Sequence, residues 1–186
     1  MATAAIETRY TPDDLLNMSD YGRFELVDGQ LMDRNMGAKS SMIGEELRRI
    51  LGNYCSDHAA GRMYGPDCGF QIFPTDSNRV RFFDGALITR GRLPGDQPPD
   101  GHCRIAPDIG IEVVSPNDIA REVDEKVEEW IAAGVPLVWV VYPDTKRIQV
   151  FRGNGTTSRL KPDDELSGEN VLPGFKCRVA EVFEGL

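Results

Sequence analysis

Short apolar runs separated by turn residues predict a helix and a hairpin at the start of the chain. Thr11 followed by Pro12 and two acids is a typical helix start, and this helix is expected to end near Asp20. Asp-Gly at positions 28–29, between the apolar runs 23–27 and 30–32, predicts a β-hairpin.

The following segment has the repeat of an amphipathic helix. Its apolar residues fall at i, i+4, i+7, i+8 and i+11, which places them on one helix face: Ile43, Leu47, Ile50, Leu51 and Tyr54. Ser40 or Ser41 is the expected N-cap, and Gly61 marks the expected end.

The pattern then changes to that of strands. Residues 69–73 and 80–89 are predicted strands, and residues 90–105, with three prolines and three glycines, are a predicted long loop. Residues 108–114 and 137–142 are nearly continuous apolar runs, typical of strands that are covered on both faces.

A helix is predicted between these two buried strands. Ser115 and Asp118 form a plausible capping box, and one helix face is apolar: Ala120, Val123, Val127, Trp130 and Ile131. Strand, helix and strand within about 35 residues predict two parallel strands with a right-handed crossover. The chain is therefore expected to form an α/β fold with a mixed β-sheet flanked by helices, preceded by the N-terminal helix and hairpin.

Composition and charge narrow the possible functions. The 186 residues are 40% hydrophobic and 27% charged, which is typical of one globular domain; we expect a single domain over residues 1–186, with 1–10 flexible. No run approaches the roughly 20 apolar residues of a membrane span, and the N-terminus lacks a secretory signal, so a cytoplasmic location is expected. A net charge of −9 disfavours a nonspecific DNA coat, but it permits an enzyme that contacts DNA through a metal ion.

The four cysteines do not have the spacing of a zinc site. Cys55, Cys68, Cys103 and Cys177 contain no C-x-x-C pair, although a site that also uses His58 and His102 can be drawn. Reduced, mostly buried thiols are the preferred interpretation.

Two acidic residues interrupt strands that are otherwise apolar. Asp84 lies within the predicted strand 80–89, and Glu112 lies within 108–114. Burying an ionised carboxylate costs several kcal/mol unless it is paired or binds a metal, and two neighbouring carboxylates repel unless a cation lies between them. Such hard oxygen ligands suit Mg²⁺ or Mn²⁺.

Lys126 is the third candidate. It follows Glu112 by 14 positions and flanks the apolar stripe of the predicted helix, from which it could point back to the strand end. Two plainer interpretations stay open at this point. The two acids could pair with Arg81 or Arg104, and Lys126 could be a solvated helix charge.

Five blocks of sequence resemble the Uma-type family of bacterial putative restriction endonucleases, which belongs to the PD-(D/E)XK nuclease superfamily. They occur in the family's order: 24–29 (FELVDG), 107–116 (PDIGIEVVSP), 125–127 (EKV), 133–141 (AGVPLVWVV) and 172–175 (LPGF). The resemblance implies a restriction-endonuclease-like core and a metal-dependent phosphodiesterase site.

The resemblance also implies roles for individual residues. Asp84 and Glu112 match the two acids, and Lys126 matches a helix lysine that replaces the superfamily's usual lysine, where Val114 stands here. Glu25 matches a glutamate of the family's first hairpin and is a weaker catalytic candidate. The chain departs from the usual Pro-Asp-Val motif at positions 83–85, where it has Phe-Asp-Gly.

The resulting hypothesis is hydrolysis of phosphodiester bonds in nucleic acid, with DNA as the expected substrate and a homodimer as the expected assembly. Asp84, Glu112 and the backbone carbonyl of Val113 would hold Mg²⁺ (or Mn²⁺), and Lys126 would orient a water molecule. A basic run near Asp84 offers the candidate nucleic-acid contacts: Arg79, Arg81, Arg90 and Arg92. The alternatives are a catalytically silent dimeric binding or regulatory module, and a hydrolase of small phosphate substrates covered by the loop 90–105.

Overall fold

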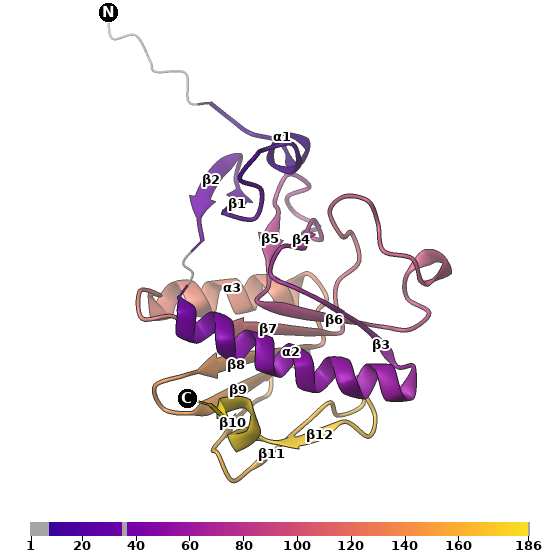
Figure 1. Ribbon diagram of the computed structural model, residues 1–186. Coiled ribbons are helices and arrows are strands. Elements are labelled where there is room, and N and C mark those ends of the chain that lie inside the picture. The colour runs from indigo at the N-terminus through magenta and orange to yellow at the C-terminus, as the bar shows by residue number, and fades with distance from the viewer. Residues whose placement is uncertain (1–7, 35–36, 186) are drawn as a thin grey trace, which may run out of the picture.

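A six-stranded mixed sheet forms the centre of the molecule, with α2 packed on one face and α3 on the other (Figure 1). This computed structural model describes residues 8–34 and 37–185. The strand order is β10-β9-β8-β7-β6-β3, and only the β7–β8 pair is parallel among the pairs of this sheet. The predicted α/β class with a mixed sheet and flanking helices is confirmed.

The N-terminal helix and hairpin are present and lie beyond one end of the sheet (Figure 1). Helix α1 (Pro12–Leu16) has the expected Thr11 cap, but it ends before Asp20 because Asn17 already leaves the helical conformation. Strands β1 (Phe24–Val27) and β2 (Gln30–Asp33) form the predicted hairpin, with positive φ at both turn residues. Of the predicted flexible stretch 1–10, residues 1–7 lie outside the described residues.

Helix α2 (Ala38–His58) starts earlier than predicted. Gly37 is its N-cap, and the hydroxyl of Ser40 donates a hydrogen bond to the Gly37 carbonyl from within the first turn. The prediction of a Ser40 or Ser41 cap is therefore wrong, because the helix begins on the N-terminal side of both. The helix ends at Ala59 in a left-handed conformation, two residues before Gly61.

The middle of the chain departs most from the predicted strands. Gly61 begins β3 (Gly61–Tyr64), which was not predicted. The predicted strand 69–73 shrinks to β4 (Gly69–Phe70). The predicted strand 80–89 splits into β5 (Arg81–Phe82), which pairs with β4, and β6 (Gly85–Thr89), which joins the central sheet. The break between them falls at Asp84, which is thereby released from regular strand pairing.

The crossover has the predicted elements. Strands β7 (Ile109–Val113) and β8 (Leu137–Tyr142) are parallel and flank α3 (Ala120–Ala132) in the chain. The predicted capping box is wrong, because the N-cap of α3 is Ile119; the Asp118 carboxylate instead accepts a hydrogen bond from the Ser115 amide in the preceding turn.

The remaining elements extend and close the sheet. The predicted loop 90–105 contains the short 3-10 helix η1 (Pro94–Asp96). Five elements follow β8 in the chain: β9 (Arg147–Arg152), β10 (Thr157–Leu160), β11 (Glu165–Ser167), β12 (Lys176–Arg178) and the 3-10 helix η2 (Val179–Phe183). The C-terminal residues pack into the same apolar cluster as α2.

The alternation of side chains along β7 decides which residues face the candidate site. Ile109, Ile111 and Val113 belong to the apolar cluster on the α2 face. Since successive residues of a strand point to opposite faces, Glu112 faces α3. Asp84 lies in the bend before β6, where this alternation does not apply, and its Oδ2 atom reaches the backbone amide of Val113, next to Glu112.

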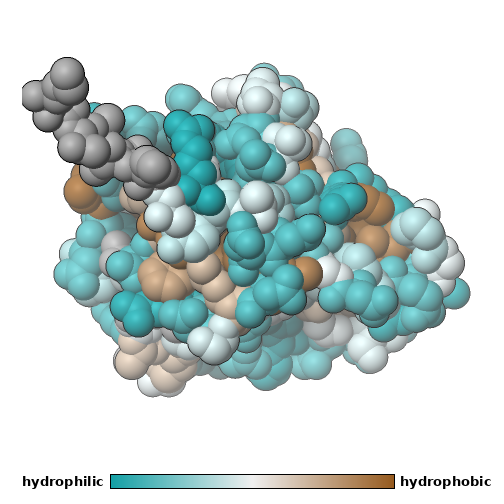
Figure 2. All heavy atoms as spheres, turned by 90° about the horizontal axis from the view of Figure 1, so that it is seen from above, coloured by the Kyte–Doolittle hydropathy of each residue, from teal (hydrophilic) through white to brown (hydrophobic). Residues whose placement is uncertain are grey.

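Seen from above, with α1 and the hairpin nearest to the viewer, the surface is largely hydrophilic, and hydrophobic residues form separate small patches (Figure 2). None of the described helices combines the length and the apolar character needed to span a bilayer.

Candidate active site

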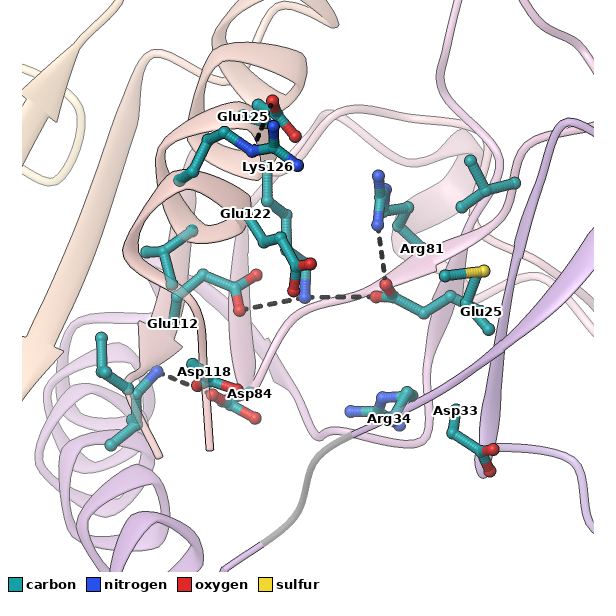
Figure 3. Close-up of a pocket in the computed structure, with 16 residues that line it drawn as sticks. Glu25, Asp33, Arg34, Arg81, Asp84, Glu112, Asp118, Glu122, Glu125 and Lys126 are labelled. Atoms are coloured by element: carbon teal, nitrogen blue, oxygen red, sulfur yellow. Dashed lines mark hydrogen bonds and ion pairs between the residues drawn. The ribbon is translucent and has the colours of Figure 1, made fainter. Parts of the chain in front are cut away.

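A cavity of about 320 Å³ lies between the hairpin, the break before β6, the end of β7 and the first turns of α3. Four residues singled out from the sequence line it: Glu25, Asp84, Glu112 and Lys126. Figure 3 shows their side chains converging from three sides, with the Lys126 ammonium in the middle. The carboxyl end of a strand in an α/β sheet is a usual place for a functional site.

Lys126 bridges two buried carboxylates. Its Nζ atom lies 3.1 Å from Oε2 of Glu112 and 3.2 Å from Oε1 of Glu25. Although burial, the largest influence, lowers the pKa of Lys126, the carboxylates of Glu112, Glu25 and Asp84 raise it above its usual value. Lys126 is therefore a charged, partly buried component of the site, which rules out the solvated helix charge considered above.

Glu112 is held at both oxygens. Oε2 accepts the bond from Lys126, and Oε1 accepts one from the indole Nε1 of Trp130 at 3.0 Å. Burial, together with the charges of Asp84 and Glu25, raises the pKa of Glu112 to about 7 despite the nearby ammonium. A carboxylate in this state gains from any further cation that enters the cavity.

Asp84 lies beside Glu112 at the start of β6. Its Oδ2 accepts a hydrogen bond of 2.7 Å from the amide of Val113, the residue after Glu112. Burial raises the pKa of Asp84, while Lys126 and the Val113 amide act in the opposite direction. Neither Asp84 nor Glu112 binds Arg81 or Arg104 in the part of the chain that the structure describes, so the plain arginine-pair interpretation is wrong.

Glu25 is the most firmly fixed of the four. Its carboxylate accepts hydrogen bonds from the Phe82 amide at 3.0 Å and from Arg81 at 2.9 Å, in addition to the Lys126 contact. Burial, the largest influence, raises the pKa of Glu25, but Lys126, Arg81 and the Phe82 amide together lower it to about 2. Glu25 therefore remains ionised and holds the lysine in place.

The four arginines of the predicted basic run do not form one patch. Arg79 and Arg81 both bind Glu129 at 2.7 Å, whereas Arg90 and Arg92, beyond the other end of β6, face Asp96 and Asp108. Because β6 separates the two pairs, the four arginines do not form one continuous patch; Arg81 lines the cavity, and nucleic-acid contacts by these arginines stay a prediction.

Two site residues were missed in the sequence. Trp130 stands four positions after Lys126, so the helical repeat alone places the two on the same face of α3. Arg34 lines the cavity from the hairpin side, where it donates hydrogen bonds to the carbonyls of Gly22 and Pro66 (Figure 3). Arg34 directly follows the hairpin, and no pattern in the sequence indicated that it lines the cavity.

The donor set fits a small hard cation with few protein ligands. Asp84 and Glu112 offer carboxylate oxygens to the same cavity, and Mg²⁺ is commonly bound by one or two carboxylates while it keeps several waters. The described residues contain no group of three or more His, Cys, Asp or Glu side chains that could hold a metal ion, and therefore no cysteine–histidine zinc site. The four cysteines are free thiols, three of them buried.

Comparisons with known proteins agree with this fold. A family model described as "Putative restriction endonuclease" (Uma2) matches residues 12–180. The crystal structure of a putative nuclease belonging to DUF820 from Anabaena variabilis ATCC 29413 is similar, with 19% sequence identity and a TM-score of 0.74 over 93% of this chain and 97% of that chain. A search of curated proteins found no match.

Proposed function

Since the chain belongs to the Uma2 family of putative restriction endonucleases, we propose that it is a metal-dependent nuclease that hydrolyses phosphodiester bonds, with DNA as the substrate. The observation that carries this proposal is the position of Lys126 against Glu112 and next to Asp84 in one cavity. Two acids that can hold a cation would provide a metal ion that activates water, and a charged lysine would stabilise negative charge on the reacting phosphate.

The residues have separate tasks in this proposal. Asp84 and Glu112, with the carbonyl of Val113, would hold Mg²⁺ or Mn²⁺. The ion, when bound, supplies a Lewis acid that neutralises charge on the phosphate and lowers the pKa of water. Lys126 holds its proton and donates hydrogen bonds toward the oxygen atoms of the reacting phosphate and water. Glu25 keeps the lysine charged and oriented by remaining ionised itself.

The charge around the cavity predicts how nucleic acid would bind. Arg34, Arg81 and Arg121 line the cavity, but so do four acids besides Glu25, Asp84 and Glu112: Asp33, Asp118, Glu122 and Glu125. This acidic rim and the net charge of −9 oppose phosphate binding, so tight binding of nucleic acid should require the divalent ion. Cutting both strands of a duplex would require two such sites, and the proposal therefore includes a homodimer.

Cleavage of labelled single-stranded DNA, duplex DNA and RNA in Mg²⁺ or Mn²⁺ tests the proposal. The Glu112→Gln and Lys126→Met variants should lose cleavage while remaining folded, and Lys176→Met is the matched control because Lys176 forms an exposed ion pair with Glu165. Cleavage by Glu112→Gln at the rate of the unaltered protein would exclude this site as the source of activity.

One observation favours a second candidate, the catalytically silent binding or regulatory module. Both oxygens of Glu112 are already bonded, so Lys126 and Trp130 satisfy this acid without a metal. The third alternative, a hydrolase of small phosphates, gains no such support, since no residue of the loop 90–105 lines the cavity that would have to be covered.

A further inference from the structure

We propose that Trp130 is a positioning residue that fixes Glu112 so that only its Oε2 atom is offered to a cation, and that this favours Mg²⁺ over the larger Ca²⁺. The inference rests on the proposed function, because it concerns the same acid. Trp130 itself does not reach the cavity, since it is absent from the residues that line it.

The hydrogen bond that carries this proposal is completely buried. Trp130 is 0% exposed, and its Nε1 atom donates to Oε1 of Glu112 over 3.0 Å. Lys126, one turn earlier on the same helix, contacts the other oxygen, Oε2. The carboxylate is thus clamped from α3 at two points, with Oε1 turned into the protein and Oε2 turned to the cavity.

The indole ring has no room to turn away from this position. Its face stacks on Phe83 with ring centroids 3.6 Å apart and an interplanar angle of 25°, and Phe73 lies against it at 5.4 Å. The Phe83 ring in turn fills the space above Gly110, where a Cβ atom would lie only 2.3 Å from it. Tertiary packing of this kind keeps a side chain in one rotamer.

This stack also connects the two acids of the site. Phe83 precedes Asp84 in the chain, and Gly110 lies two residues before Glu112 on the same side of β7. The aromatic residue at position 83, where the Uma-type pattern has proline, therefore supports Trp130 and so helps to fix both carboxylates relative to each other.

The second tryptophan provides an internal comparison. Trp139 is also 0% exposed, but its Nε1 has no hydrogen-bond partner in the described part of the chain. Replacing Trp139 with Phe removes a buried indole without removing a bond to a site residue. Trp130→Phe makes the same change of side chain, from indole to phenyl, and in addition removes the hydrogen bond to Glu112.

The consequence of the clamp is a carboxylate that binds through one oxygen. Mg²⁺ takes near-ideal octahedral geometry with few protein ligands, whereas Ca²⁺ takes six to eight oxygens and often binds a carboxylate through both. Loss of a residue that orients a metal ligand typically weakens metal binding by 10–100-fold. We therefore expect Trp130→Phe to weaken Mg²⁺ binding by about tenfold and to weaken Ca²⁺ binding much less.

Nuclear magnetic resonance of the two indole N–H groups tests the hydrogen bond in the full chain. Trp139→Phe leaves a single indole signal, which assigns Trp130. Glu112→Gln should shift the Trp130 signal and leave the Trp139 signal in place. Addition of Mg²⁺ to the unaltered protein should shift the Trp130 signal until the metal site is saturated. A Trp130 signal unaffected by Glu112→Gln would overturn the proposal, even where Trp130→Phe does not fold.

Calorimetric titration with Mg²⁺ and Ca²⁺ completes the test. Trp130→Phe should lose most of the preference for Mg²⁺, and Trp139→Phe should bind like the unaltered protein. Equal losses in both variants, or none in Trp130→Phe, would overturn the positioning role while leaving the proposed metal site intact. Absence of Mg²⁺ binding in the unaltered protein would instead overturn both proposals.

Discussion

Replacing Lys126 with Met should destabilise the fold in a way that depends on pH. The substitution keeps the length of the side chain and removes the ammonium that lies 3.1 Å from Glu112 and 3.2 Å from Glu25. Hydrogen bonds to charged groups contribute about 1.5–3 kcal/mol each, and breaking a buried ion pair costs about 3–5 kcal/mol. The Lys126 side chain is 22% exposed, so we expect a loss near the lower end, about 3 kcal/mol at pH 8.

The sign of the pH dependence follows from Glu112. Its pKa in the folded protein is about 7, above the ordinary value of 4.5, so its ionisation lowers stability as pH rises through this interval. Removing Lys126 takes away an influence that lowers this pKa, and Glu112 then keeps its proton to a higher pH. The cost of Lys126→Met should therefore be about half as large at pH 6, where protonated Glu112 needs no cation, as at pH 8.

Urea unfolding of the variant and the unaltered protein at pH 6 and pH 8 measures this difference. A loss of about 3 kcal/mol corresponds to a melting temperature lower by roughly 6–12 °C for a chain of this size. Lys176→Met, at an exposed ion pair, should change stability by less than about 0.5 kcal/mol at either pH. A loss of the same size at both pH values would refute the coupling between Lys126 and the carboxylates.

Three further predictions concern residues around the site. Glu25→Gln should destabilise the protein by about 2–3 kcal/mol at pH 7. This loss of stability should shrink as the pH falls from 4.5 toward 2, because folding lowers the pKa of Glu25 to about 2. Acid titration of the variant and the unaltered protein, followed by circular dichroism, measures the difference. Gly110→Ala should cost at least about 2 kcal/mol in urea unfolding, since the added Cβ meets the Phe83 ring, whereas Gly65→Ala, with no atom within 4 Å of the added Cβ, should cost less. Arg34→Gln should weaken Mg²⁺-dependent binding of DNA in a fluorescence anisotropy assay, with a smaller salt dependence than the unaltered protein shows.

The elements that could be predicted are those whose signal is local. The hairpin follows from Asp-Gly, since both residues adopt the positive φ that this turn requires. The parallel crossover follows from two buried apolar runs joined by an amphipathic helix. Glu112 could be identified because a charged residue in such a run needs a partner, and the structure supplies Lys126.

The errors arose where tertiary contacts override local pattern. Strand β3 contains Gly61 and Arg62 and has little strand propensity of its own; it exists because it pairs with β6. Residues 80–89 were predicted as one strand interrupted by Asp84, but the strand divides at this residue because its two halves pair in different sheets. The bond from Trp130 to Glu112 depends on how α3 packs on the sheet, so the sequence indicated only an apolar helix position.

The direct test of the central claim is calorimetric titration of Mg²⁺ and Mn²⁺ at low salt into the unaltered protein, Glu112→Gln and the exposed control Glu165→Gln. A metal-binding measurement requires no assumption about the substrate, whereas a cleavage assay does. The proposed site predicts one binding event in the unaltered protein and in Glu165→Gln, and its loss in Glu112→Gln. Absence of binding in all three folded proteins, or equal binding in all three, would contradict the assignment of Glu112 as a metal ligand.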